Sequence, residues 1–346
     1  MVPNRLTEVH RKVGRPMRLR SMVVGTIALS LAPAFVQAEV SRLDPVPASS
    51  AAAPTRQALA AGIVDVGGER ERAAKALEPV EGMISAMIVS RLSLKGAGTA
   101  DQVKSIVHET LSPVAPKVTD AEIEAYAANF SSEQLRDVLA FMRSPAGLVG
   151  TANLALLKQE LSAALSGSPS NAGEEAARVF AGVPSAKREL VRRILTAQDF
   201  EARTRKGYAS LGAAFNAAAP RSPDGNSPEE SLSGEEQARR DHAADDYVRL
   251  VMEIEQRHYV DHFSDAQLAA MADYLESDAG RAVLARTPTV KLAAGRVFLD
   301  QLAVAIPSLN GSICAAIPCS PEQRAQLADL THAIALRLPS FAGLLG

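Results

Sequence analysis

The chain has no tryptophan, and aromatic residues make up only 4% of its 346 residues. A sheet-rich fold usually draws on more aromatic and β-branched side chains than this. The hydrophobic residues, 47% of the chain, are mostly Ala, Leu and Val, which suit helices that pack closely through small side chains. The composition therefore predicts an all-α, multi-helix bundle, and the length allows one large helical domain or two of ordinary size.

Cysteine is almost absent. The two cysteines, Cys314 and Cys319, lie close together near the carboxyl end. In an oxidising compartment such a pair can form a local disulfide. A metal site would need further Cys or His residues nearby, and a redox motif would favour the closer Cys-x-x-Cys spacing. A local disulfide is therefore the preferred interpretation.

Long apolar runs are rare, and the clearest one lies near the amino terminus. The stretch Met22–Val36 follows three arginines and leads to a small-x-small sequence that ends at Ala38. This order is typical of a cleaved signal peptide, and a start at Met17 instead of Met1 would give it a compact basic leader. The run is shorter than the ~20 residues that cross a bilayer, and we expect no transmembrane segment in the mature chain. The predicted location is periplasmic or secreted.

Clustered positive charge is also missing. The chain has 37 Lys and Arg residues against 39 Asp and Glu residues, and loss of the signal peptide would make the mature chain more acidic. Nucleic-acid-binding surfaces depend on clustered Lys and Arg. We therefore expect no nucleic-acid partner.

Proline, serine and glycine divide the remaining sequence into segments. Helical spacing of apolar residues fills most of the intervals between them, and Pro288 is expected to kink or divide a helix over 279–305. The predicted organisation is a signal peptide (1–38), a flexible leader (39–57), a first helical repeat (58–166), connecting helices (167–219), a disordered linker (220–234), a second helical repeat (235–305) and a C-terminal helix with the Cys314/Cys319 loop (306–346).

A motif occurs twice at a constant offset of 133 residues, as Tyr-x-x-x-Phe-Ser-x-x-Gln-Leu followed by Ser-x-Ala-Gly. Within each copy the Ser and Gln have the spacing of a capping box, and the flanking Phe and Leu have the spacing of a hydrophobic staple. The later Ser can cap a third helix, and the small Ala-Gly pair permits close helix approach. The motif predicts a helix-corner-helix-corner-helix unit in two copies, an architectural role carried by Phe130, Ser131, Gln134, Leu135 and Gly147 in the first copy and by Phe263, Ser264, Gln267, Leu268 and Gly280 in the second.

This pattern resembles the exported helical bacterial proteins of domain-of-unknown-function family 2059. Their core is an aromatic-Ser/Thr-x-x-Glu/Gln-Leu corner followed by an aromatic-x-x-Ser-x-x-Gly stretch. The resemblance covers roughly residues 119–160 and 245–295, and departs from the family where Leu148 and Val149 replace the polar residues that usually follow the glycine. It implies an exported helical protein with two copies of the core motif, and it implies no particular activity.

One group of residues has the spacing of a metal site. His258 and His262 are four residues apart, so they share a helix face, and Glu255 lies one turn earlier. The zinc-protease motif would place Glu directly after the first His, where this chain has Tyr259. The first copy of the motif has Ala125 and Asn129 at the positions of the two histidines. An exposed polar face is the favoured interpretation, with a metal site formed by His258, His262 and Glu255 as the alternative.

The sequence contains no Ser/His/Asp or Cys/His set with local support for a nucleophilic site, and no cofactor is expected. The favoured interpretation is a non-enzymatic protein-interaction or structural module of the cell envelope, whose partner is an envelope protein or a second copy. One alternative is a binder of an apolar small molecule or lipid between helices. Another is a zinc-dependent hydrolase that uses His258 and His262.

Overall fold

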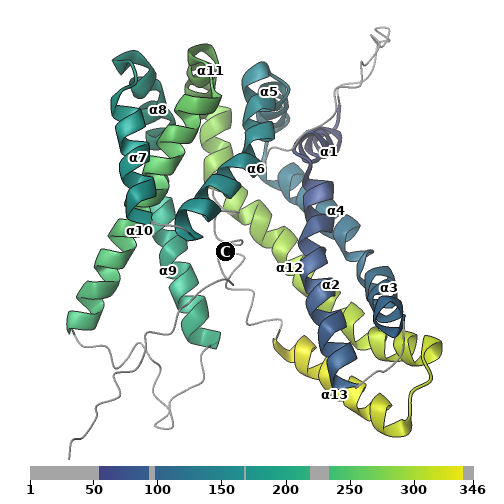
Figure 1. Ribbon diagram of the computed structural model, residues 1–346. Helices are drawn as coiled ribbons and strands as arrows, with labels where there is room; N and C mark the ends of the chain where they lie inside the picture. The colour runs from purple at the N-terminus through teal and green to yellow at the C-terminus, as the bar shows by residue number, and fades with distance from the viewer. Residues whose placement is uncertain (1–53, 93–97, 167–168, 219–233, 338–346) are drawn as a thin grey trace, which may run out of the picture.

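The computed structural model describes residues 54–92, 98–166, 169–218 and 234–337, which are almost entirely helical and contain no strand (Figure 1). The all-α fold expected from the composition is therefore present. The predicted signal peptide and the predicted linker up to residue 233 lie outside the described residues, as does most of the predicted leader. The helices are α1 (Arg56–Val66), α2 (Glu69–Arg91), α3 (Thr99–Leu111), α4 (Val114–Asn129), α5 (Ser132–Met142), α6 (Pro145–Ser166), α7 (Pro169–Ala181), α8 (Ser185–Ala197), α9 (Phe200–Ala218), α10 (Gly234–His262), α11 (Asp265–Leu275), α12 (Asp278–Ala316) and α13 (Pro321–Arg337).

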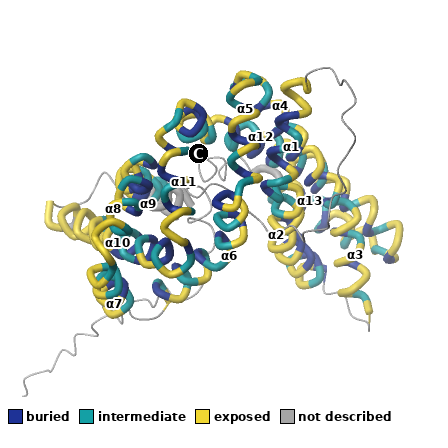
Figure 2. Tube along the Cα trace, turned by 90° about the horizontal axis from the view of Figure 1, so that it is seen from above, coloured by how far each residue is buried: buried dark blue, intermediate teal, exposed yellow. Residues whose placement is uncertain are grey.

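The helices form two groups, joined by α6 and α12. In Figure 1, α7 to α11 stand on one side, α1 to α4 with α13 stand on the other, and α6 crosses between them. Helix α12 packs along α4 and continues to α3 and α13, while α6 packs against α5, α10 and α11. Buried residues line the inner face of each helix and exposed residues line the outer face (Figure 2). Long, one-sided helices of this kind obtain most of their stability from tertiary packing.

Buried apolar side chains fall into three clusters. The first joins α6 to α11, the second joins α2, α3, α12 and α13, and the third joins α1, α4, α5 and part of α12. Most of their members are Leu, Ile, Val and Ala, as the composition predicted. Because α12 contributes to two clusters, it ties the α1/α4/α5 group to α2, α3 and α13.

The two helix corners have closely similar capping geometry. Ser131 Oγ accepts a hydrogen bond from Gln134 N at 3.1 Å, and the Gln134 side chain accepts one from Ser131 N at 3.1 Å. At the second corner the corresponding distances between Ser264 and Gln267 are 3.3 and 2.8 Å. The flanking side chains that were expected to form the hydrophobic staples, Phe130, Leu135, Phe263 and Leu268, are all buried. Each corner thus fixes where one helix ends and the next begins.

The turn into the third helix of each set explains the glycines. Gly280 N donates to Ser277 Oγ at 3.1 Å, as Gly147 N does to Ser144 Oγ at 3.2 Å. A Cβ atom on Gly280 would lie 2.0 Å from the carbonyl oxygen of Tyr274, and one on Gly147 would lie 2.2 Å from that of Phe141. Glycine is therefore required because the backbone of the preceding helix touches the turn. The sequence analysis had instead explained the Ala-Gly pair by a close approach between two helices.

Two aromatic residues near the ends of α5 and α11 contact each other. Phe141 and Tyr274 occupy matching positions of the two copies of the motif. Their rings stack with centroids 3.8 Å apart and an interplanar angle of 1°. The third helices α6 and α12 both pack on helices from the other half of the chain, α6 on α10 and α11 and α12 on α4 and α5. Helix α6 therefore crosses to α10 and α12 crosses to α4, while each keeps a contact with the helix before it, α5 or α11.

The expected division of this helix at Pro288 was wrong, and a kink there, the other expected outcome, stays a prediction. Helix α12 runs through Pro288 and Pro307 and ends at Ala316, beyond the predicted boundary at residue 305. A proline inside a helix removes one hydrogen bond and crowds the preceding turn. Packing against α3, α4 and α13 on most of its length compensates for this cost, so tertiary contacts override the local signal.

Near the end of α12, the sulfur atoms of Cys314 and Cys319 are within disulfide distance, with Cα atoms 5.2 Å apart. Helix α12 is also the one described helix that is long and apolar enough to cross a membrane by length and composition. The sequence analysis did not identify α12 as a segment of this length and apolar composition. Part of its surface, including Leu302, Ile306 and Leu309, is buried in the second cluster.

Candidate metal centre

Two histidines and one glutamate from distant parts of the chain meet at the contact between α6 and α10. Glu160 Oε2 lies 2.8 Å from His258 Nδ1, and Glu160 Oε1 lies 3.1 Å from His262 Nε2. The three ligand atoms lie within 4.8 Å of one another. His258 is 3% exposed, whereas the side chains of His262 and Glu160 are 28% and 32% exposed. The cluster thus has one buried ligand and two that reach the surface.

The helix α10 places its two histidines by simple periodicity. Residues four apart lie one above the other on the same helix face, and the ring centroids of His258 and His262 are 4.8 Å apart. The corner that follows, with Phe263 buried and Ser264 as the N-cap, fixes the end of the helix directly after His262. The ligand pair is therefore held on a rigid element.

Glu160 was missed by the sequence analysis. It lies 98 residues before His258, and no spacing rule connects residues that far apart. It enters the cluster because α6 packs across α10. The only local signal is a charged residue in an apolar helix, at the position where the second copy has Ala293.

Glu255, the carboxylate selected from the sequence, is not part of the cluster. It is buried, and burial raises its pKa to about 8, an effect that the nearby Glu160 charge reinforces and that a hydrogen bond with Tyr259 opposes. At neutral pH Glu255 is therefore mostly protonated. A protonated carboxyl group beside Tyr259 is a poor metal ligand, and Glu160 occupies the role that the sequence analysis gave to Glu255.

The favoured interpretation of this helix face as exposed and polar was also wrong at two positions. Glu255 and His258 are 5% and 3% exposed. Burial lowers the pKa of His258, because the imidazolium ion is disfavoured in an apolar setting, although the hydrogen bond with Glu160 opposes this. His258 is therefore neutral near pH 7, the form of imidazole that binds metals.

The matching positions of the first copy have none of these ligands. At the constant offset of 133 residues, His258 corresponds to Ala125, His262 to Asn129 and Glu160 to Ala293. Ala125 and Ala293 belong to the same apolar cluster, and the Asn129 amide donates to the Ala125 carbonyl at 2.8 Å. The packing of α12 on α4, which corresponds to the packing of α6 on α10, thus uses Ala125, Asn129 and Ala293. The fold does not need the charged cluster.

The ligand types suit a small divalent ion. Zinc bonds of about 2.0–2.1 Å in a tetrahedral arrangement separate neighbouring ligand atoms by about 3.3 Å. The two N···O distances, 2.8 and 3.1 Å, are hydrogen bonds to the two different oxygens of Glu160, and the three ligand atoms lie within 4.8 Å of one another, so binding an ion would require small side-chain rotations. Two imidazole nitrogens and one carboxylate oxygen form a ligand set of the catalytic-zinc type, which leaves a fourth position for water or another ligand. Without an ion, the same two nitrogens can donate their protons to Glu160.

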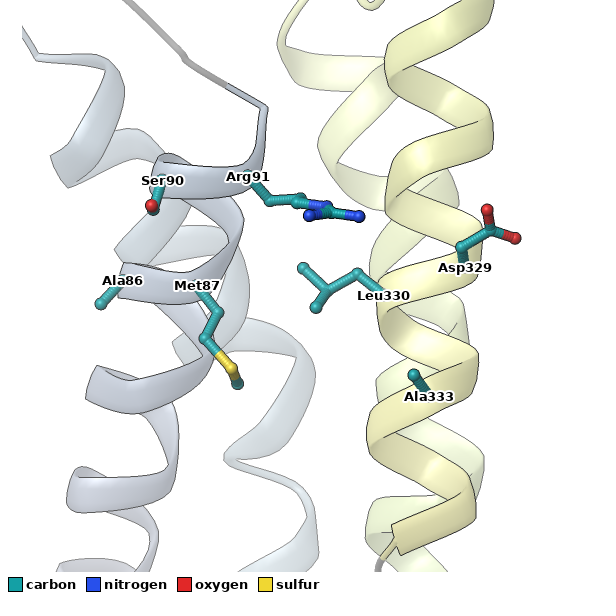
Figure 3. Close-up of a pocket in the computed structure, with 7 residues that line it drawn as sticks. All are labelled: Ala86, Met87, Ser90, Arg91, Asp329, Leu330 and Ala333. Atoms are coloured by element: carbon teal, nitrogen blue, oxygen red, sulfur yellow. The ribbon is translucent and has the colours of Figure 1, made fainter.

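A second feature is an open groove between α2 and α13, with a volume of 560 Å³. Figure 3 shows Met87 and Arg91 of α2 and Leu330 of α13 extending into the space between the helices. Its remaining lining residues are Ala86, Ser90, Asp329 and Ala333. The groove is mainly apolar and lies on the opposite side of the molecule from the Glu160/His258/His262 cluster.

Comparison with known proteins found no matching family model, no matching curated protein and no matching solved structure. The resemblance to domain-of-unknown-function family 2059 therefore stays a prediction from the motif residues alone.

Proposed function

We propose that this chain is an exported helical protein that binds one divalent transition-metal ion, of the zinc class, through Glu160, His258 and His262. The observation that carries the proposal is the convergence of three ligands at one helix crossing when the matching crossing has Ala125, Asn129 and Ala293. A cluster required for folding would be expected at both crossings. A cluster present at one of them is better explained by a ligand.

The chemistry of the ligands supports the same choice. Imidazole suits zinc, copper, iron and nickel, and a single carboxylate completes a mixed nitrogen and oxygen set. Binding an ion would displace the protons that the two imidazoles share with Glu160, so affinity should fall in acid. Export through the predicted signal peptide would place the site in the periplasm or the medium, and the Cys314/Cys319 pair is compatible with such an oxidising compartment.

The bound ion would join parts of the chain that the duplicated motif separates. We infer that the two helix-corner-helix-corner-helix sets arose by internal duplication, supported by the paired capping boxes and by the stacking of Phe141 on Tyr274. Glu160 belongs to the first set and both histidines belong to the second.

A structural role of the ion is the simpler form of the proposal. The alternative role is that of a zinc hydrolase that uses His258 and His262. Hydrolysis of a substrate would then require a water molecule bound to the ion at the open fourth position.

The test uses the mature protein, residues 39–346, freed of metal by a chelator and then titrated with zinc. We expect the wild-type midpoint of thermal unfolding to rise with zinc and to return to its starting value with chelator, since an ion bound 100-fold above its Kd adds about 2.7 kcal/mol. His262→Asn introduces the residue found at the matching position, so it should fold normally and lose the zinc response.

The matched control is His242→Ala, which removes an exposed histidine from the same helix. It should keep the full zinc response. If His262→Asn responds to zinc as strongly as the wild type, the Glu160/His258/His262 cluster is not the binding site.

The groove between α2 and α13 favours a second candidate function, a helical interaction module that binds an apolar small molecule, a lipid or another envelope protein, or that associates with itself. An open, mainly apolar groove between helices is a common place for such ligands. Replacing Leu330 in the groove by Asp should abolish an adduct seen by native mass spectrometry of protein purified without detergent, or a complex seen by light scattering. A bare monomer in both measurements would speak against this candidate.

A further inference from the structure

The groove between α2 and α13 has a polar end and an apolar end. Ser90 and Arg91 of α2 lie at the polar end, level with Asp329 of α13 (Figure 3). Residues one turn apart share a helix face, so the preceding turn of α2 and the following turn of α13 line the same groove. This part of the wall is apolar and consists of Ala86, Met87, Leu330 and Ala333. The groove is therefore amphipathic along its length.

The apolar wall is only partly covered by the protein itself. Met87 and Leu330 pack against the second cluster but are not fully buried. Met83, one turn before Met87 on the same face of α2, is 52% exposed and extends the apolar strip away from Arg91. Methionine side chains are unbranched and polarisable, and they adapt to apolar ligands. An apolar chain along this strip would cover surface that the protein leaves in water.

Arg91 supplies a positive charge that no other residue neutralises. Its guanidinium group extends into the space between the helices, whereas the Asp329 carboxylate is directed away from α2 (Figure 3). Arg91 is exposed, and within the part of the chain that the structure describes no residue forms a hydrogen bond or an ion pair with its side chain. A guanidinium group binds carboxylates through two parallel N–H donors. The polar end thus presents unused donors to an anionic group.

The size of the groove favours a small molecule over a partner helix. Its volume of 560 Å³ lies within the range of small-molecule sites. One turn of an α-helix with its side chains occupies about 400–600 Å³, from a diameter of about 10–12 Å and a pitch of about 5.4 Å. The groove would therefore hold only about one turn of a helix.

We propose that the groove binds one long-chain fatty acid, with its carboxylate on Arg91 and its hydrocarbon chain along Met87, Leu330 and Met83. This inference rests on the second candidate function and names its ligand. Arg91 is the one cation among the residues that line the groove, which matches a head group with a single negative charge. The strip takes one chain, whereas a diacyl lipid would leave its second chain in water.

The test is calorimetric titration of the metal-free mature protein, residues 39–346, with decanoate, dodecanoate and decanol below their micelle or solubility limits. Metal is removed so that no carboxylate ligand binds an ion at the Glu160/His258/His262 cluster. We expect one dodecanoate per chain, and a Kd that falls about two- to fourfold for each methylene added between decanoate and dodecanoate. Decanol has no charge and should bind about fivefold more weakly than decanoate.

Three variants separate the head group from the chain. Arg91→Gln should weaken decanoate binding about fivefold and leave decanol binding unchanged, because it removes the charge and keeps the apolar wall. Arg324→Gln, the matched control, removes an exposed arginine of α13 outside the groove and should behave as wild type. Asp329→Asn should bind decanoate at least as tightly as the wild type, because it removes a negative charge from the polar end.

Equal binding of decanoate and decanol by the wild type, or an unchanged decanoate Kd in Arg91→Gln, would overturn the fatty-acid assignment and leave an apolar ligand in the groove. Weaker decanoate binding by Asp329→Asn would overturn it as well, because Arg91 would then not be the residue that selects the head group. Binding of neither decanoate nor dodecanoate would refute the fatty acid. If decanol also failed to bind, only the protein-binding form of the second candidate would remain, which light scattering tests separately.

Discussion

At the scale of single residues, the charged side chains of α10 have different states although they share one helix face. Glu255 is buried and mostly protonated, because burial raises its pKa to about 8. His258 is buried and neutral, because burial lowers its pKa. Only His262, at the end of the helix, reaches solvent appreciably. The environment therefore selects the neutral forms of both buried groups.

The raised pKa of Glu255 makes a prediction about pH. The folded state holds a proton that the unfolded state releases near pH 4.3, so this residue's contribution to stability is complete below that pH and is lost as pH rises to about 8. In metal-free protein, Glu255→Gln should remove up to about 5 kcal/mol of this loss, since each pKa unit corresponds to about 1.4 kcal/mol.

Urea unfolding at pH 5, 7 and 9 measures the effect. The free energy of unfolding of Glu255→Gln, relative to that of the wild type, should increase as pH rises to about 8 and then stay constant. The exposed control Glu322→Gln should show the same pH dependence as the wild type. A constant difference between Glu255→Gln and the wild type at all pH values would show that Glu255 is ionised in the folded protein.

At the scale of structural elements, the corners were the most predictable feature of the chain. Ser131 and Gln134 lie within one turn of each other, and so do Ser264 and Gln267, so their spacing alone defines the capping box. The reason for the glycines was less accessible. Gly147 and Gly280 are each required by a carbonyl oxygen six residues earlier, and that contact appears only once the turn is folded.

The corner before α12 gives a prediction at this scale. Gly280→Ala would place Cβ 2.0 Å from the Tyr274 carbonyl oxygen, so the turn must open and the free energy of unfolding should fall by about 2–4 kcal/mol. Gly311→Ala, in the same helix but with no heavy atom within 4 Å of the new Cβ, should instead stabilise by about 0.5–1 kcal/mol. Denaturant unfolding of the two variants provides the comparison. Equal effects of the two substitutions would contradict the role assigned to the corner.

The course of α12 exceeded what local patterns can predict. Pro288 and Pro307 are strong helix-breaking signals, yet the helix continues through both. Its packing partners α3, α4 and α13 come from both ends of the chain, and none is adjacent to the prolines in sequence. Propensity is a local quantity, whereas the energy that keeps this helix intact is tertiary.

At the scale of the whole molecule, the crossing of α6 over α10 creates the candidate metal centre, because it brings Glu160 to the two histidines. The sequence identified the helical class and the histidine pair from composition and periodicity. It did not identify Glu160, because its contact with His258 spans 98 residues and follows from the topology.

The difference between the two crossings is the main argument for a function. One crossing is filled by Ala125, Asn129 and Ala293, and the other by two histidines and a glutamate. Because the backbone arrangement tolerates small uncharged residues at the first crossing, we propose that the polar set at the second serves to bind an ion.

The most direct test of this account is the zinc stoichiometry of the mature protein, measured by elemental analysis after loading and extensive dialysis. We predict one zinc ion per chain for the wild type and for His242→Ala, and none for His262→Asn or Glu160→Gln. A wild-type protein that retains no metal, or a His262→Asn variant that retains as much as the wild type, would contradict the claim that Glu160, His258 and His262 form a metal centre.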